Sequence, residues 1–218
     1  MRTADAPNAD QIVAVLSAAD LNVTDLDSPE WRKVPVVQID RYWSGELAPK
    51  SRHAEARLIW SDQALYVRFT CHQAEPLIIN DSPQTEKKSM RLWDRDVCEV
   101  VIAPDPNEVE RYFELEAAPT GEWLDVAIQW TPNRRESDWE FNSHMTTASR
   151  VESDRVTTVM RIPWSDRIPQ PQRGDGWRVN LFRCVGSDPD RGYLAWQPTR
   201  TPKPGFHVPQ AFGWLVFG

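Results

Sequence analysis

Short runs of alternating apolar and polar residues extend through most of the chain, separated by clusters of Pro, Asp, Asn and Gly. Alternation with a period of two is typical of β-strands, and stretches with helical periodicity are nearly absent. We therefore expect an all-β protein, an antiparallel β-sandwich of the immunoglobulin or jelly-roll type with about nine to eleven strands. Residues 31–218 would form this domain, and the polar, Asp-rich residues 1–30 would form a leader packed on it.

The pattern is clearest in the runs at 97–104 and 111–117. Their inward positions are apolar: Cys98, Val100, Ile102, Phe113, Leu115 and Ala117. Their outward positions include Glu99 in the first run and Glu114 and Glu116 in the second, so the sequence predicts an acidic row on one strand face. For residues 131–150 the sequence predicts a long, mobile loop.

The net charge of the chain is −7, from 25 basic and 32 acidic residues. Phosphate backbones and anionic lipids would repel such a chain on average, so we expect no nucleic-acid or membrane partner. No run reaches the roughly 18 apolar residues of a membrane span, and the N-terminal stretch is not typical of a secretory signal, which slightly favours the cytoplasm. The three cysteines lack metal or redox spacing and are interpreted as buried apolar residues. The oligomeric state is not predicted.

Eleven tryptophans are many for so polar a chain, and two of them stand where a ring can meet a ligand. Trp93 lies just before the run at 97–104, and Trp196 comes before a proline-rich irregular segment. The apolar face of an exposed ring stacks on the C–H face of a pyranose, and two rings can hold one sugar between them. The alternative for Trp93 is a ring packed over the end of the sandwich.

Glu114 and Glu116 are two residues apart on one strand face, which separates them by about 6.6–7 Å. That distance overlaps the roughly 6.5–9.5 Å between the carboxylates of an inverting glycosidase. A general acid needs a pKa raised by an apolar pocket, whereas acids on a strand face in water stay ionised. We therefore favour a solvated face over sugar or cation binding, and both over catalysis.

Other polar residues leave alternatives open. Arg183 shares its strand face with apolar residues, so its guanidinium either holds the hydroxyls of a sugar or pairs with Glu99. Four acids offer the hard oxygen ligands that calcium prefers, although no D-x-D-x-D-G loop orders them: Asp94, Asp96, Asp105 and Glu108. Calcium therefore stays open as a cofactor, and no metal ligands are assigned.

Four segments, in this order, resemble the family 9 carbohydrate-binding modules and their stand-alone, DOMON-like relatives: "LWDRDVCEVVIAPD", "RYFELEAAPTGEWLDV", "WRVNLFRCV" and "WQPTRTPKPGFHVPQAFGWLVF". The resemblance covers residues 30–218, and the terminal "FH-P-FG-L-F" pattern is its most specific part. It implies a non-catalytic β-sandwich, often calcium-containing, that clamps a terminal sugar between two tryptophans. By this resemblance Trp93 and Trp196 are the clamp, and Glu99, Glu114 and Arg183 are the polar contacts.

We therefore predict a non-enzymatic protein that binds a carbohydrate through stacking tryptophans and polar strand-face residues. One alternative is a glycoside hydrolase that uses Glu114 and Glu116 as its paired carboxylates. A second is a haem-binding relative with Met and His as axial ligands. A third is a structural module whose rings dock on a partner protein.

Overall fold

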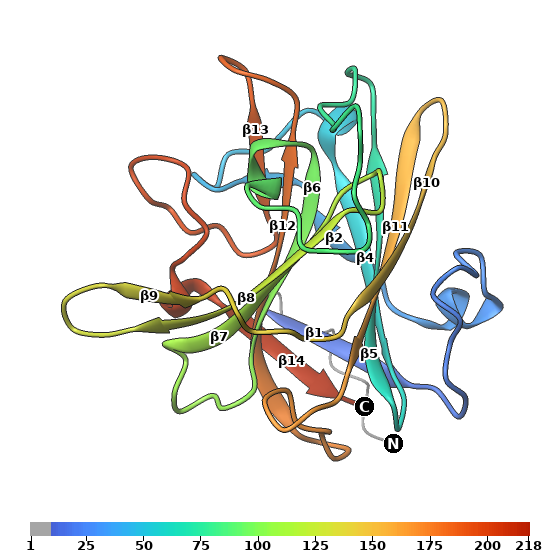
Figure 1. Ribbon diagram of the computed structural model, residues 1–218, viewed down its shortest axis with the longest axis vertical. Coiled ribbons are helices and arrows are strands. Elements are labelled where there is room, and N and C mark those ends of the chain that lie inside the picture. The colour runs from blue at the N-terminus through green and yellow to red at the C-terminus, as the bar shows by residue number, and fades with distance from the viewer. Residues whose placement is uncertain (1–9) are drawn as a thin grey trace, which may run out of the picture.

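The computed structural model describes residues 10–218, which form fourteen β-strands and four short 3-10 helices (Figure 1). The strands make two sheets, here called sheet A and sheet B, that share one core. Sheet A has the order β9-β8-β7-β6-β12-β14-β1, with β13 beside β12 and β3 beside β13. Sheet B has the order β10-β11-β5-β4-β1, with β2 beside β4.

The strands of sheet A are β3 (Arg41–Tyr42), β6 (Val97–Ala103), β7 (Arg111–Ala117), β8 (Trp123–Trp130), β9 (Arg135–Asp138), β12 (Gly176–Val185), β13 (Gly192–Ala195) and β14 (Gly213–Phe217). Those of sheet B are β2 (Val37–Ile39), β4 (Ala54–Trp60), β5 (Ala64–His72), β10 (Thr146–Val151) and β11 (Arg155–Pro163). The 3-10 helices are η1 (Pro29–Lys33), η2 (Lys50–Arg52), η3 (Leu92–Asp94) and η4 (Pro209–Ala211). The all-β class is thus confirmed for the described residues.

Strand β1 (Gln11–Leu16) joins the two sheets. Its first part, from Gln11 to Ala14, pairs with β14, and Val15 and Leu16 pair with β4. Both pairings are parallel, so the prediction of a purely antiparallel sandwich is wrong. The predicted leader therefore contributes a strand to the sandwich, while its residues 1–9 lie outside the described part of the chain.

The number of strands also exceeds the about nine to eleven that the sequence predicts. Residues 131–150 are not a long loop, because they contain β9 and most of β10. Strand β9 is short and mostly exposed, so it carries no apolar alternation that could reveal it.

The core lies between the two sheets, and the inward positions predicted for β6 and β7 are confirmed. Phe69 and Cys71 of β5 reach the same core from sheet B. The Sγ atoms of Cys71 and Cys98 are 3.3 Å apart across the two sheets, and all three cysteines are free and buried. Their interpretation as buried residues is therefore confirmed.

The segment that follows β1 covers the outer face of sheet B. The Asp20 carboxylate accepts hydrogen bonds from the hydroxyls of Tyr66 and Ser61 and pairs with Arg161 at 3.1 Å. Burial raises the pKa of Asp20, but these hydrogen bonds outweigh burial and hold the pKa below its usual value. Further along, Trp31 packs in an apolar cluster with side chains of β4 and β5.

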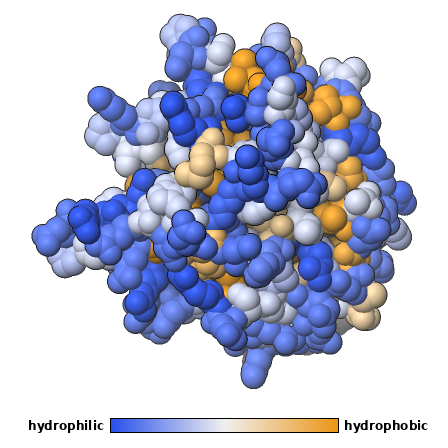
Figure 2. Space-filling model, in the orientation of Figure 1, coloured by the Kyte–Doolittle hydropathy of each residue, from blue (hydrophilic) through white to orange (hydrophobic). Residues whose placement is uncertain are grey.

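The face of the molecule in Figure 2 is mostly hydrophilic, and its hydrophobic groups form small separate patches. Two tryptophans keep more than a third of their surface exposed, Trp139 at 37% and Trp214 at 39%. Within residues 10–218, no helix is both long and apolar enough to cross a membrane.

Candidate functional site

A pocket of about 370 Å³ lies over the outer face of sheet A, the face turned away from the core. It lies between β9 and the segment 204–207, which follows β13 at the left of Figure 1. Four aromatic rings line it: Trp93, Trp139, Tyr193 and Phe206. We call this cavity the aromatic pocket.

Trp93 is held in place by the short helix η3 and by an arginine from a distant turn. The residue before η3, Arg91, has the left-handed backbone conformation (φ 61°), which turns the chain sharply into η3. The guanidinium of Arg191 donates to the carbonyl oxygens of Trp93 at 2.9 Å and Arg95 at 2.5 Å. Trp93 is half-buried, so part of its ring remains available to a ligand.

Trp139 follows β9 and is anchored through its backbone. The Lys88 ammonium donates to the carbonyl oxygen of Trp139 at 3.0 Å and to that of Phe141, and it pairs with the Asp125 carboxylate at 2.6 Å. The ring centroids of Trp93 and Trp139 are 6.0 Å apart with a 39° tilt. At this distance two aromatic rings contact each other, so the pair forms a continuous tilted surface rather than an open slot.

The floor of the pocket is acidic. Glu99 of β6 and Glu114 of β7 line it, and Glu116 lies on the same sheet face, directly opposite Glu99. The outward phase predicted for these residues is confirmed, but the predicted solvated face is wrong: they are 2%, 6% and 0% exposed. Burial, and then the neighbouring carboxylates, raises the pKa of Glu99 and of Glu116 well above the usual value.

His207 closes one side of the pocket floor. Its Nδ1 lies 2.9 Å from the Tyr112 hydroxyl, which in turn accepts a hydrogen bond from the Trp130 indole. Burial, helped by the positive charge of Arg135, lowers the pKa of His207 to about 3, so the imidazole is neutral at physiological pH. Its 3.7 Å contact with the Glu114 carboxylate is therefore not an ion pair.

Arg183 does not lie in this pocket. It is 3% exposed on the opposite sheet face from Glu99, so the two do not pair. Its guanidinium donates to the carbonyl oxygens of Arg52 at 2.7 Å and His53 at 3.0 Å and to the Gln73 side chain at 2.8 Å. These acceptors satisfy the buried Arg183 guanidinium, so it needs neither Glu99 nor a sugar as a partner.

Trp196 is also outside the aromatic pocket. Its ring packs against the main core, close to Gly213, where an added Cβ would overlap it. The structure therefore does not bring Trp93 and Trp196 together around one cavity. Trp139, which no sequence signal singled out because it lies in the presumed loop, is the tryptophan beside Trp93.

The four acids considered for calcium are each engaged by a protein donor: Asp94 by Arg91, Asp96 by the amide of Gly186, Asp105 by the amide of Asn107, and Glu108 by Arg111. They do not gather into one cluster. Among residues 10–218, the one group of acidic or ligating side chains compact enough for a metal ion is Glu99, Glu114 and Glu116.

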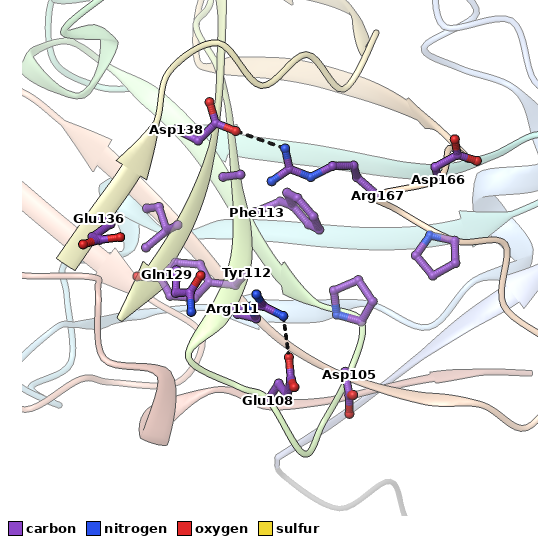
Figure 3. A pocket seen from close by; sticks show the side chains of 14 residues that line it. Asp105, Glu108, Arg111, Tyr112, Phe113, Gln129, Glu136, Asp138, Asp166 and Arg167 are labelled. Carbon is purple, nitrogen blue, oxygen red and sulfur yellow. Dashed lines mark hydrogen bonds and ion pairs between the residues drawn. The ribbon is translucent and has the colours of Figure 1, made fainter. Parts of the chain in front are cut away.

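A second and larger pocket, of about 590 Å³, lies beside β7 and β8 (Figure 3). We call it the charged pocket. Its arginines are already paired, Arg111 with Glu108 at 2.9 Å and Arg167 with Asp138 at 3.0 Å. No tryptophan lines it, so the aromatic pocket is the better candidate for a ligand with apolar faces.

Comparison with solved structures finds the same fold in sugar-related proteins. A proposed carbohydrate-binding protein from Bacteroides uniformis is 16% identical, with a TM-score of 0.75 over 96% of this chain and 99% of that one. A family 9 carbohydrate-binding module from Caldicellulosiruptor kristjanssonii in complex with cellotriose is 14% identical, with a TM-score of 0.65 over 95% and 93%. A module of that family and organism in complex with glucose is 16% identical, with a TM-score of 0.63 over 95% of each chain.

The search of curated proteins gave no match. The family model described as carbohydrate family 9 binding domain-like matches residues 25–217, nearly the whole length of the two sheets. This match confirms the resemblance seen in the sequence, and the chain belongs to the carbohydrate family 9 binding domain-like family.

Proposed function

We propose that this protein binds a carbohydrate in the aromatic pocket and does not catalyse its reaction. The observation that carries the proposal is the convergence of tryptophan rings and carboxylates from distant segments in one cavity. The family of the chain, and the relatives solved with cellotriose and glucose, support a sugar as the ligand.

In this proposal Trp93 and Trp139 supply the apolar platform. Because their rings contact each other, a sugar stacks on the ring face that is open to the pocket or parts the two rings on entering. Glu99 and Glu114 accept hydrogen bonds from its hydroxyls. Glu99 Oε1 is buried and has no hydrogen-bond donor from the protein, so a sugar hydroxyl can donate to it. Arg183 and Trp196 are not part of the proposed site.

The arrangement of the carboxyl groups favours binding over hydrolysis. A glycosidase places its two carboxyl groups about 5–5.5 Å or about 6.5–9.5 Å apart, on either side of the scissile bond. Here all three glutamates rise from the same floor, and one oxygen from each lies within 4.8 Å of the others. The other acid that lines the pocket, Asp94, accepts a hydrogen bond from Arg91.

Substitution of the two platform tryptophans tests the proposal. We expect Trp93→Ala and Trp139→Ala each to weaken binding about 10- to 200-fold, as lost packing contacts in a ligand pocket do, with little change in melting temperature. Trp214→Ala is the matched control, since Trp214 is equally exposed but packs under Arg178 outside the pocket. A glycan array identifies the sugar, and calorimetric titration with that sugar measures the affinity.

Unchanged affinity in both pocket variants would exclude the aromatic pocket as the sugar site. If the wild-type protein bound no sugar on the array, carbohydrate binding itself would be contradicted. Hydrolysis of aryl glycosides by the wild-type protein, lost in Glu114→Gln, would show an enzyme instead.

A further inference from the structure

Two of the three cysteines face each other from opposite sheets. Cys71 lies near the end of β5 in sheet B, and Cys98 lies near the start of β6 in sheet A. Their Sγ atoms are 3.3 Å apart, within hydrogen-bond distance, although the two residues are 27 positions apart in the chain. In antibody domains a disulfide joins the two facing sheets of a sandwich, so a bond in this direction fits the architecture.

The neighbours of the pair leave the two sulfurs room to move. Ala54 is directly opposite Cys71 on β4, and Ala117 is directly opposite Cys98 on β7. Both alanines are buried, so small side chains flank the sulfurs inside the core. A disulfide bond is about 2.05 Å long, so the sulfurs need to approach by roughly 1.25 Å, which side-chain rotation beside such small neighbours can supply.

A buried guanidinium beside the pair favours a thiolate. Arg183 is directly opposite Cys98 on β12, and the hydrogen bonds that its guanidinium makes within residues 10–218 all go to uncharged acceptors. The hydrogen bond from Cys98, helped by the charge of Arg183 and opposed by burial and by Asp96, lowers the pKa of Cys71. The same hydrogen bond, together with burial, raises the pKa of Cys98 well above its usual value. Cys71 is therefore the nucleophile of the pair, and Cys98 is the donor.

A small cavity gives access to the pair that depends on the size of the reagent. Its volume is about 10 Å³, close to the room that one water molecule needs, and both cysteines line it beside the half-buried Pro119. The exposed fractions of Cys71 and Cys98 are 3% and 5%. Hydrogen peroxide is little larger than water and can reach the sulfurs, whereas a bulky aromatic thiol reagent cannot.

We propose that Cys71 and Cys98 form a reversible disulfide across the two sheets, with hydrogen peroxide as the oxidant. The Cys71 thiolate attacks one peroxide oxygen, the O–O bond breaks, and a sulfenic acid forms on Cys71. The leaving hydroxide takes up the proton that Cys71 gave up and becomes water. The Cys98 sulfur then attacks Cys71 Sγ, the S–O bond breaks, and the Cys98 proton joins the leaving hydroxide as a second water. Two thiols thus lose two electrons, and one peroxide is reduced to two waters.

The disulfide ties down one wall of the aromatic pocket. It closes a loop over residues 72–97, which contains η3 and with it Trp93. Cys184, the third cysteine, also borders the small cavity, but its side chain packs on the outer face of sheet A with Val97 and Leu124. It is equally buried and does not face Cys71, so it serves as the matched control.

Peroxide treatment of the reduced full-length protein tests the proposal. The protein is reduced with a dithiol, freed of the dithiol and exposed to hydrogen peroxide at neutral pH in the native state. We expect the intact mass to fall by two hydrogen atoms, peptide mapping to find Cys71 joined to Cys98, and a dithiol to restore both thiols by exchange. The crosslinked protein should melt roughly 4–16 °C above the reduced protein, because a disulfide restricts the unfolded chain.

Two variants assign these effects to the pair. Cys98→Ser should lose both the crosslink and the rise in melting temperature, and its Cys71 should gain oxygen instead. Cys184→Ser should keep both. If Cys98→Ser fails to fold, the mapped crosslink and the two melting temperatures of the wild type still decide.

A wild-type protein that keeps its thiols under peroxide, or that is oxidised only to sulfinic acid, would overturn the proposal. A crosslink that includes Cys184, or one that does not raise the melting temperature, would do so as well. None of these measurements involves a sugar, so failure of the disulfide and failure of carbohydrate binding are told apart.

Discussion

The ion pair between Lys88 and Asp125 lies under the segment that carries Trp139, and its removal is a direct test of how the pocket is built. Asp125 is 0% exposed on its side chain and Lys88 19%, with 2.6 Å between the Lys88 ammonium and the carboxylate. The other Asp125 oxygen accepts from the amide of Ser143 at 2.6 Å. Lys88 also donates to the carbonyl oxygens of Asp125, Trp139 and Phe141.

Lys88→Met keeps most of the side-chain volume but leaves the Asp125 charge buried beside its remaining partner. Removal of one member of a buried pair reduces the free energy of unfolding by about 3–5 kcal/mol. The partial exposure of Lys88 places the expected loss at the lower end of that range. At about 2–4 °C per kcal/mol for a domain of this size, a loss of about 3 kcal/mol should lower the melting temperature by roughly 6–12 °C.

Chemical and thermal denaturation measure this loss, and Lys87→Met is the matched control because Lys87 is exposed next to it. The double variant Lys88→Met/Asp125→Leu removes the stranded charge, so it should be more stable than Lys88→Met alone. Lys88→Met should also weaken sugar binding, since the Trp139 backbone loses a donor. A Lys88→Met protein within about 0.5 kcal/mol of the wild type would refute the reasoning, because that is the range of an ordinary surface substitution.

Three further predictions concern other parts of the molecule. The pKa of Asp20 is lowered in the folded protein, so its contribution to stability is present above the unfolded pKa and is lost as the pH falls through the folded pKa. Asp20→Asn removes this contribution. The melting temperature of Asp20→Asn should therefore fall less steeply with decreasing pH below about pH 4 than that of the wild type. Gly213→Ala should lower the free energy of unfolding by about 1–3 kcal/mol, measured with denaturant, because the new Cβ overlaps the Trp196 ring. Cys71 and Cys98 should react with a thiol reagent only after denaturation, and rapid labelling of both in the native protein would show that they are not buried.

The strands that the sequence predicts well are those with one apolar and one polar face. In β6 and β7 each inward position is apolar, so the phase follows from local alternation. The parallel pairing of β1 with β14 and β4 could not be predicted, because its partners are distant in the sequence and the run itself shows only that it is apolar. Strand β9 is mostly exposed, so no hydrophobic pattern marked it.

The site was predictable only in part, for the same reason. Trp93, Glu99 and Glu114 were identified from their positions beside and on strands, and the structure brings these three into one pocket. The burial of the acids depends on the segments 135–139 and 204–207, which fold over the sheet from far along the chain. Trp139 was therefore missed, since its importance comes from the Trp93 ring it contacts rather than from its own neighbours in sequence.

The surroundings of Glu99, Glu114 and Glu116 on the outer face of sheet A indicate that these residues serve ligand binding rather than stability. Val101, Val126 and Phe182 lie on that face and are buried under the covering segments, so the sheet is shielded from water on both sides. A face built only for stability would place more apolar residues where Glu99, Glu114 and Glu116 stand, since buried charged groups are replaced by apolar ones at little or no loss. Three acids kept in such surroundings reduce stability, and residues that reduce stability concentrate where a protein binds its ligand. The same reasoning does not extend to Asp125, because Lys88 compensates its charge within the chain.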